Sequence, residues 1–200
     1  MDDSENEAQQ RRTMSRNAHS AILNAVDPRC DAVLEVQGQE GNFDLYVSTR
    51  VLSLASSVFG KMFSSGYKEG YEQNKGLRHI RVPLPEDDGD ALLAICKVIH
   101  HRAGDLGSMF SASEILNIAY VSEKYDFTET LRHWSSTWLK ESLEQSPRED
   151  LNSILRAACM LDSWEEFSHI SFDVIRHQTG SFIQHPLSEV VGLPESTNGK

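Results

Sequence analysis

The chain has 200 residues, of which 39% are hydrophobic and 24% are charged, and its formal net charge is −11 at pH 7. This length and composition predict one sizeable folded domain with a helical appendage and exclude a wholly disordered chain. The strong negative charge repels phosphate backbones, so we expect no nucleic-acid partner.

No stretch of the sequence has the length or composition of a membrane span or of a secretory signal. The longest apolar runs, such as residues 91–95, fall far short of the roughly 20 residues that cross a bilayer, and residues 1–10 are acidic and polar. The three cysteines are too few and too far apart for a disulfide framework. We therefore expect an intracellular protein, in the cytoplasm, the nucleus or both, without a membrane partner.

Residues 1–26 are predicted to form an N-terminal tail that ends in a short amphipathic helix. Small and apolar residues recur there at helical spacing, namely Ala18, Ala21, Ile22, Ala25 and Val26. The pattern stops at Asp27 and Pro28. The apolar stripe of such a helix has to be buried, either on its own domain or against another copy.

From residue 31 the apolar period changes to two. Ala32, Leu34 and Val36 alternate with Val33 and Glu35, and after residues 38–42 a second set, Phe43, Leu45 and Val47, alternates with Asp44 and Tyr46. This alternation places the apolar side chains on one face of a strand. We therefore expect a β-hairpin with one buried face, its loop lying at residues 38–42.

Two short helices and a third strand are expected to follow the hairpin. Ser48 or Thr49 offers a hydroxyl cap to the first helix, and Ser56 or Ser57 offers one to the second. A glycine-bounded polar loop spans residues 66–76, and residues 80–83 then alternate as a strand does. If this strand lies at a sheet edge, Arg78 and Arg81 are expected to protect it from pairing with other chains.

The rest of the chain is predicted to be helical, because several starts carry capping residues. The expected starts are Asp88 or Asp90 before residues 91–101, Ser111 with Glu114 before residues 115–125, Asp126 or Thr128 before a helix through Trp138, residues 146–149 with Pro147 at the first helical position, and Ser163 with Glu166 before residues 167–175. Gly180 is expected to end the last helix. The polar stretch 141–146 is the expected boundary between the domain and its extension.

The order of these motifs resembles the opening of BTB/POZ domains. The resemblance rests on residues 31–36, 45–48, 51–52, 56–59 and 62–63, and it continues through residues 82–88 and the helices up to Trp134. It covers residues 27–140. Serine occupies positions 48 and 57, where the family usually has histidine and proline.

The resemblance implies an α/β (α+β) fold, with a short mixed sheet of three or more strands flanked by helices. Residues 147–180 would add a C-terminal helical extension, and residues 181–200 would form a flexible tail. No kelch repeat, zinc finger, ankyrin repeat or other recognition domain accompanies the predicted module.

A BTB/POZ domain implies a non-enzymatic scaffold that associates with itself or with another BTB protein. The N-terminal helix with Ile22, Ala25 and Val26 is then the expected element of self-association.

The alternative is a substrate adaptor of a cullin-type ubiquitin ligase. The triplet Tyr67, Lys68 and Glu69 follows the Met-Phe helix as a similar triplet does in BTB domains that dock onto a cullin. The aromatic ring would fill an apolar pocket while the carboxylate pairs with a basic or amide donor.

The familiar catalytic and nucleotide-binding motifs are missing from the sequence, so we expect no enzymatic activity, no cofactor and no small-molecule substrate. Residues 86–90 hold the densest group of carboxylates, which we interpret as a helix N-terminus rather than a cation site. No metal site is expected.

Two further groups of residues have structural interpretations. Cys96 and His100 are four residues apart, but no second pair completes a metal site, so a buried thiol is expected. His100 and His101 are expected at a helix C-terminus, where imidazolium is favoured. The three tryptophans, Trp134, Trp138 and Trp164, are interpreted as core packing.

Overall fold

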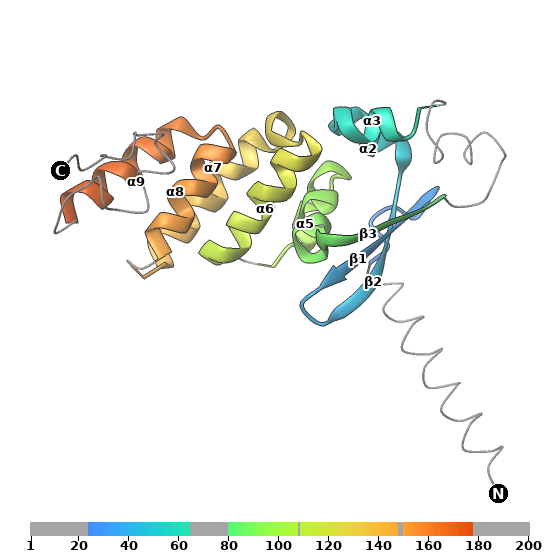
Figure 1. Cartoon of the computed structure of the whole chain (residues 1–200), viewed down its shortest axis with the longest axis horizontal. Coiled ribbons are helices and arrows are strands. Elements are labelled where there is room, and N and C mark those ends of the chain that lie inside the picture. The colour runs from blue at the N-terminus through green and yellow to red at the C-terminus, as the bar shows by residue number, and fades with distance from the viewer. Residues whose placement is uncertain (1–23, 65–79, 108, 148–149, 178–200) are drawn as a thin grey trace, which may run out of the picture. The chain divides into compact units, whose positions relative to one another are not determined.

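The computed structural model describes residues 24–64, 80–107, 109–147 and 150–177. Within these ranges the chain is an α+β protein with one three-stranded mixed sheet and seven α-helices (Figure 1). It divides into two compact units, the first ending at Leu106 and the second beginning at Gly107. The sheet lies in the first unit, and the second unit is helical. None of the described helices is long and apolar enough to cross a membrane.

The predicted hairpin is confirmed. Strands β1 (Ala32–Gly38) and β2 (Gly41–Val47) pair antiparallel, with Leu34 opposite Leu45. The turn is tighter than predicted, with only two residues between the strands, and Gly41 follows it with a φ of 119° that side-chain-bearing residues rarely adopt. Val33, on the face expected to be open, is also buried at 1% exposure.

Strand β3 (Ile80–Asp88) lies parallel to β1, so the sheet order is β2-β1-β3. It runs five residues beyond the predicted end at Pro83. The short helices α2 (Thr49–Ala55) and α3 (Ser57–Met62) come between β2 and β3 in the chain, and Ser56 caps α3 as predicted by accepting a hydrogen bond from the Phe59 N–H at 3.0 Å.

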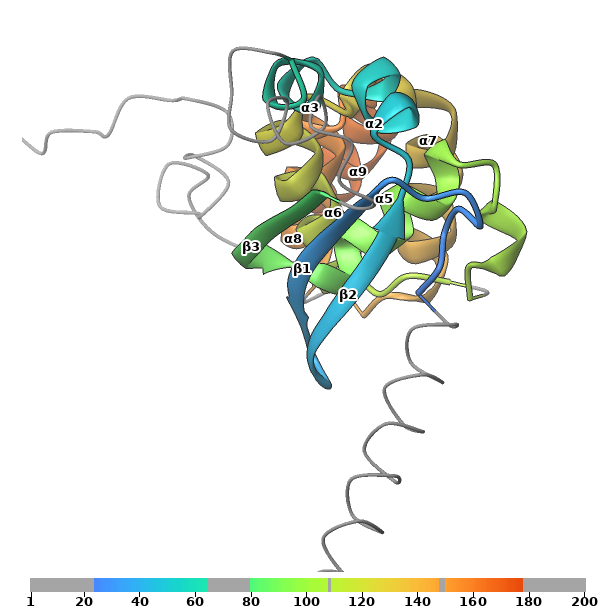
Figure 2. The same ribbon diagram turned by 90° about the vertical axis from the view of Figure 1, so that its right-hand side faces the viewer.

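Helix α5 (Gly89–Ile99) packs against the sheet and closes the core of the first unit (Figure 2). Gly89 makes the close approach feasible, because a Cβ atom there would lie 2.8 Å from Val36 Cγ2 and 2.9 Å from the Gln37 carbonyl oxygen. A short 3-10 helix, η1 (Ala103–Asp105), follows α5. The core includes Leu34, Leu45 and Ile95, each with no exposed surface.

The second unit contains α6 (Ala112–Tyr125), α7 (Thr128–Gln145), α8 (Leu151–Met160) and α9 (Trp164–His177). Helix α8 packs against the other three, and α9 also packs against α7. The capping box at the start of α6 is confirmed, with both the Ser111 and the Glu114 side chains in their capping hydrogen bonds.

Some helix ends differ from the predictions. Asp126 does not cap α7; it ends α6 in the left-handed region with a φ of 58°, and Phe127 precedes α7 without a side-chain cap. Helix α8 begins at Leu151 rather than at Pro147, while Arg148 and Glu149 lie outside the described residues. The stretch 141–146, predicted as a boundary, is helical through Gln145, and the two compact units divide at residues 106 and 107 instead.

Candidate protein-interaction site

Two of the predicted interaction elements lie wholly or partly outside the described residues. The whole triplet Tyr67, Lys68 and Glu69 lies outside the described residues, and so does Ile22 of the N-terminal element. Ala25 and Val26 are described, and they are not helical: Ala25 forms a parallel bridge with Tyr46 of β2. The predicted helix therefore does not extend to Val26.

The segment around Val26 extends the sheet instead of forming a helical stripe. The backbone N–H groups of Val26 and Asp27 donate to the Tyr46 carbonyl at 3.0 and 3.2 Å, and the Tyr46 N–H donates to the Asn24 carbonyl at 3.2 Å. The Val26 side chain is 3% exposed. It is thus buried within its own unit, although this does not test the predicted role of the N-terminal region in self-association.

The opposite edge of the sheet belongs to β3, and two prolines interrupt it. The Ile80 N–H donates to the Asp31 carbonyl at 3.0 Å, so even-numbered residues of β3 direct their N–H groups toward β1. The alternate positions, which face away from β1, include the exposed Pro83 and Pro85. Proline has no N–H to donate, so a further strand cannot pair regularly here.

Arg81 contributes to the same strand in a different way from the predicted one. Its guanidinium contacts the Glu35 carboxylate on β1 and lies 2.9 Å from Asp44 Oδ2 on β2. The hydrogen bonds that the guanidinium donates to these two carboxylates raise the pKa of Arg81 above its ordinary value. Arg81 therefore links β3 to β1 and β2 through ion pairs on one face of the sheet. Its charge also lies near the edge that β3 forms.

The start of α2 is held by side chains from distant parts of the first unit. Asp31 accepts hydrogen bonds from the Thr49 N–H at 2.7 Å and from Thr49 Oγ1 at 2.6 Å. The Ser48 side chain makes no capping hydrogen bond, contrary to the prediction, and the Ser48 N–H donates to His100 Nε2 at 3.1 Å. We call these four residues, Asp31, Ser48, Thr49 and His100, the α2-start cluster.

The hydrogen bonds of His100 fix its tautomer. Nδ1 lies 2.8 Å from the Cys96 carbonyl oxygen, which can only accept, so Nδ1 carries the proton and Nε2 is left as the acceptor for Ser48. Burial lowers the pKa of His100, against the opposing effects of the Cys96 carbonyl and of Asp27. The histidine does lie at a helix C-terminus as predicted, but the lowered pKa does not agree with the expected preference for imidazolium, because burial disfavours the charged ring.

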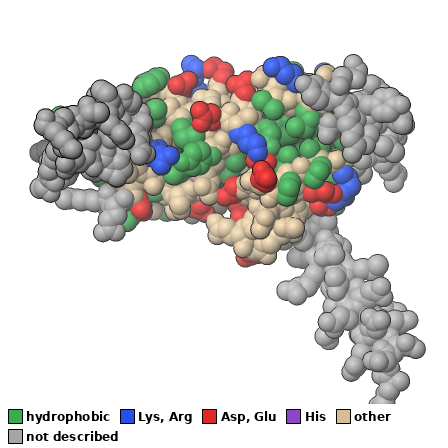
Figure 3. All heavy atoms as spheres, in the orientation of Figure 1, with side chains coloured by type: hydrophobic (Ala, Val, Ile, Leu, Met, Phe, Trp, Pro, Cys, Tyr) green, Lys and Arg blue, Asp and Glu red, His purple; other side chains and the backbone are tan. Residues whose placement is uncertain are grey.

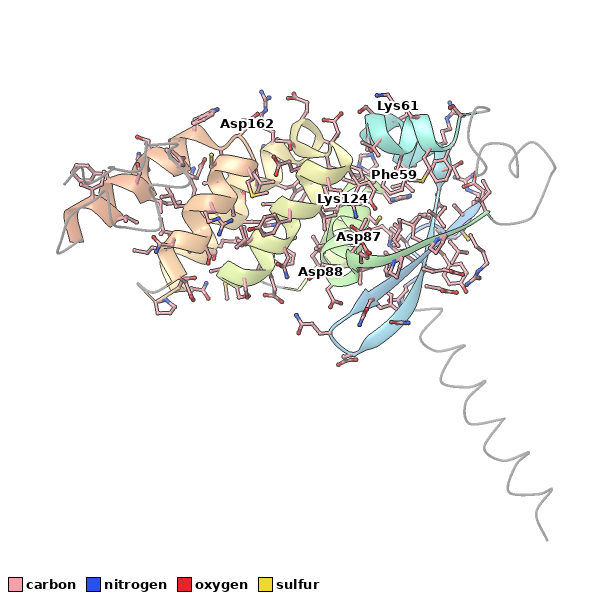
Figure 4. The ribbon with its side chains drawn as sticks, in the orientation of Figure 1. Phe59, Lys61, Asp87, Asp88, Lys124 and Asp162 are labelled. Carbon is pink, nitrogen blue, oxygen red and sulfur yellow. The ribbon has the colours of Figure 1, made fainter. Side chains whose placement is uncertain are left out.

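The cysteine and the carboxylates near α5 have structural roles. Cys96 has no exposed surface, and burial raises the pKa of its thiol to about 12, which confirms the buried core thiol. Asp88 caps α5 by accepting a hydrogen bond from the Ala91 N–H at 2.9 Å, as the helix interpretation predicts (Figure 4). Among the described residues, no three His, Cys, Asp or Glu side chains are grouped so as to hold a metal ion.

Several large hydrophobic side chains of the second unit are exposed. Figure 3 shows hydrophobic side chains at the surface of both described units. Of the three tryptophans interpreted as core, only Trp138 is buried, and its ring packs edge-on against Phe110 with centroids 5.2 Å apart. Trp134 is 37% exposed and Trp164 is 62% exposed. The packing interpretation is therefore wrong for Trp164.

Three of the exposed hydrophobic side chains of the second unit lie on helix α9. Trp164, Phe172 and Ile175 are 62%, 65% and 57% exposed, and at 100° per residue they fall within one sector of about 80°. Phe172 and Ile175 were not predicted as interaction residues. Their periodicity was visible, but periodicity alone does not tell which apolar positions of a helix reach the core.

Polar side chains at the start of α9 and on its buried face form hydrogen bonds with side chains of α7. Glu166 is 5% exposed and accepts hydrogen bonds from Ser136 Oγ at 2.5 Å and from Lys140 Nζ at 3.2 Å. Burial acts to raise the pKa of Glu166, but these bonds and one from its own backbone lower it overall. Ser163 contacts Ser135 Oγ at 3.0 Å, so both residues of the predicted capping box join α9 to α7.

We call the exposed surface formed by Trp164, Phe172 and Ile175 the α9 apolar row. Large apolar side chains exposed together on one helix face make that face a candidate site of protein contact. A comparison of the chain with models of known protein families found no match, and a comparison with curated proteins found none either.

Proposed function

We propose that this chain is a protein-interaction module of the BTB/POZ type, a non-enzymatic scaffold that associates with itself or with another module of the same kind. The observation that carries the proposal is the α9 apolar row, three large hydrophobic side chains exposed on one face of one helix. Leaving such side chains in water costs free energy that contact with another protein recovers.

The order of elements in the first unit supports the type of module. A hairpin, two short helices, a strand parallel to the first strand and a helix follow one another along the chain. This is the order that the sequence resemblance to BTB/POZ domains implies. The proposal therefore combines the element order of one unit with the exposed surface of the other.

Static light scattering after size exclusion, over a concentration series, tests association directly. The full chain is compared with a chain that begins at Asn24. The truncation stops before Val26, because removal of Val26 would uncover β2 and disturb the fold itself. We expect a concentration-dependent rise above the monomer mass. A monomer at every concentration, together with no binding to BTB modules added in excess, would contradict the proposal.

The adaptor of a cullin-type ligase remains the alternative function. It is favoured by the end of α3 at Met62, with Phe59 and Phe63 buried, because the triplet Tyr67-Lys68-Glu69 then follows the helix within a few residues. The test is binding of purified cullin to the chain carrying both Tyr67→Ala and Glu69→Ala. The neighbouring pair Tyr71→Ala and Glu72→Ala is a control of the same chemistry, and equal binding by both variants would refute the adaptor role.

A further inference from the structure

The α9 apolar row is part of a longer seam along α9. Trp164, Ser168, Ser171 and Ile175 follow one another at spacings of four, three and four residues. This spacing is that of the contact positions in a two-helix coiled coil. Phe172 lies beside the seam on one flank. The opposite face of α9, with Ile170 and Val174 buried, packs against α7 and α8, so the seam is directed away from its own bundle.

We infer that the α9 seam pairs antiparallel with the α9 seam of a second copy of this chain. The inference rests on the proposed function and names its partner and its surface. A second copy is favoured because the seam is complementary to itself. In an antiparallel coiled coil, the a positions of one helix face the d positions of the other. This places Trp164 opposite Ile175 of the second copy at both ends of the seam.

The middle of the seam permits the close approach that this pairing needs. Ser168 lies opposite Ser171 of the second copy on both sides of the two-fold axis, which passes between His169 and Ile170. Small side chains at the crossing let two helices come together, while the large ones at the ends fill the flanking space. Phe172 then lies beside Trp164 of the second copy, which adds a second aromatic contact at each end.

The exposed area indicates how strong the pairing is. Three large side chains, each more than half exposed, offer on the order of 300 to 400 Å² of apolar surface per copy. A standard stable interface buries about 800 Å² per partner, so the dimer is weak, with dissociation in the range of tens to hundreds of micromolar. The net charge of −11 repels the second copy, so added salt strengthens the dimer.

Sedimentation equilibrium of the full chain, at concentrations from about ten to several hundred micromolar, is the first test. The weight-average mass is expected to rise toward that of a dimer. Ile175→Glu buries a carboxylate in the seam and is expected to weaken association at least tenfold. Leu54→Glu is the matched control, because Leu54 is 81% exposed on α2 and is not part of the seam. Trp164→Ala is a second seam variant with the same expected direction.

Disulfide trapping tests the antiparallel register independently of affinity. Ser168→Cys chains mixed with Ser171→Cys chains are expected to form the mixed disulfide in excess over either homodisulfide, as identified by peptide mass spectrometry. Each chain carries only one new cysteine, so the mixed disulfide reports two copies. Native cysteines do not confuse the result, because the linked peptides are identified by mass.

Two outcomes overturn the inference while leaving the proposed function in place. If the chain dimerises and Ile175→Glu dimerises equally well, another surface holds the copies together. If the chain stays monomeric but binds a different BTB module through the seam, the partner is not a second copy. If it stays monomeric and hydrogen exchange shows the Trp164 region protected by residues 178–200 of the same chain, both the inference and the role of the row as a free surface fail.

Discussion

The two units of this chain use their large hydrophobic residues differently. In the described part of the first unit, the sheet and α5 bury nearly all of theirs, and Leu54 is the large exposed one. The described part of the second unit exposes Met109, Tyr120, Trp134, Trp164, Phe172 and Ile175 to at least 37%. Exposed apolar surface is therefore concentrated in the second unit.

The two units also differ in the elements that their polar side chains connect. The first unit fixes the start of α2 with Asp31, the residue before β1, and with His100, the C-cap residue of α5. The second unit joins α7 and α9 through Ser135, Ser163 and Glu166. In both units polar groups set how elements meet; among the described helices, α9 of the second unit is the one that keeps three large apolar side chains exposed on one face.

The largest expected effect compares a core side chain with one from the α9 apolar row. Leu34→Ala is expected to lower the free energy of unfolding by about 2 to 5 kcal/mol, because Leu34 has no exposed surface and its truncation leaves a cavity. Trp164→Ala is expected to change the stability of the monomer by less than about 1 kcal/mol, since most of the ring is already in water. Urea unfolding at a concentration below that of association measures both.

Leu54→Ala is the control for a large side chain in the first unit that contributes little burial. Its expected change is within about 0.5 kcal/mol. If Trp164→Ala destabilised the monomer as much as Leu34→Ala does, the α9 apolar row would belong to the core, and the contrast between the two units would disappear.

A smaller effect is expected at the α2-start cluster. Asp31→Ala removes the acceptor of two hydrogen bonds from Thr49 and is expected to cost about 1 to 3 kcal/mol. Thr49→Val removes only the hydroxyl bond and should cost less. A double-mutant cycle measures the coupling between them, and a coupling energy near zero would show that Asp31 does not hold α2.

Much of the first unit follows from local patterns in the sequence. The alternation of residues 31–36 and 43–47 predicts the hairpin, and the caps at Ser56 and Asp88 are confirmed, as is the Ser111 cap of α6 in the second unit. These features depend on residues a few positions apart, so one sequence is enough to recognise them. The resemblance to BTB/POZ domains adds the expected order of the elements.

The features that were missed depend on residues far apart in the chain. Ser48 looks like a helix cap, yet the start of α2 is held by Asp31 and His100, which are 18 and 52 residues away from their partners. Ser163 and Glu166 match a capping box, yet they contact α7. Trp164 lies on an apolar helix face that tertiary packing leaves open. Local pattern shows where a helix begins but not which of its faces is covered.

The smallest expected effect is a difference in pH dependence between the two units, and it depends on His100. The pKa of His100 is lowered in the folded protein from an ordinary value of 6.5. Below that pH the unfolded chain binds a proton that the folded chain does not, so the free energy of unfolding falls as the pH falls toward the folded value. Protonation would also place an N–H of the ring against the Ser48 N–H, which removes the acceptor at the start of α2.

Glu166 is expected to act in a lower pH range. Its pKa is lowered from an ordinary value of 4.5, so its contribution is present above that value and is lost as the pH falls through the folded pKa. Acidification from pH 7 should therefore weaken the first unit before the second. Unit-specific hydrogen exchange, corrected for the intrinsic effect of pH, measures the order of the two losses.

The variant His100→Gln measures how much the histidine contributes to stability and to its pH dependence. At neutral pH the variant is expected to be less stable by about 0.5 to 1.5 kcal/mol, because the hydrogen bonds of the ring are lost or weakened. Between pH 7 and pH 5 its stability should decline less steeply than that of the unmodified chain. If His100→Gln retained the full slope, the acid sensitivity would come from other groups, and the α2-start cluster would be a structural contact without a role in the pH response.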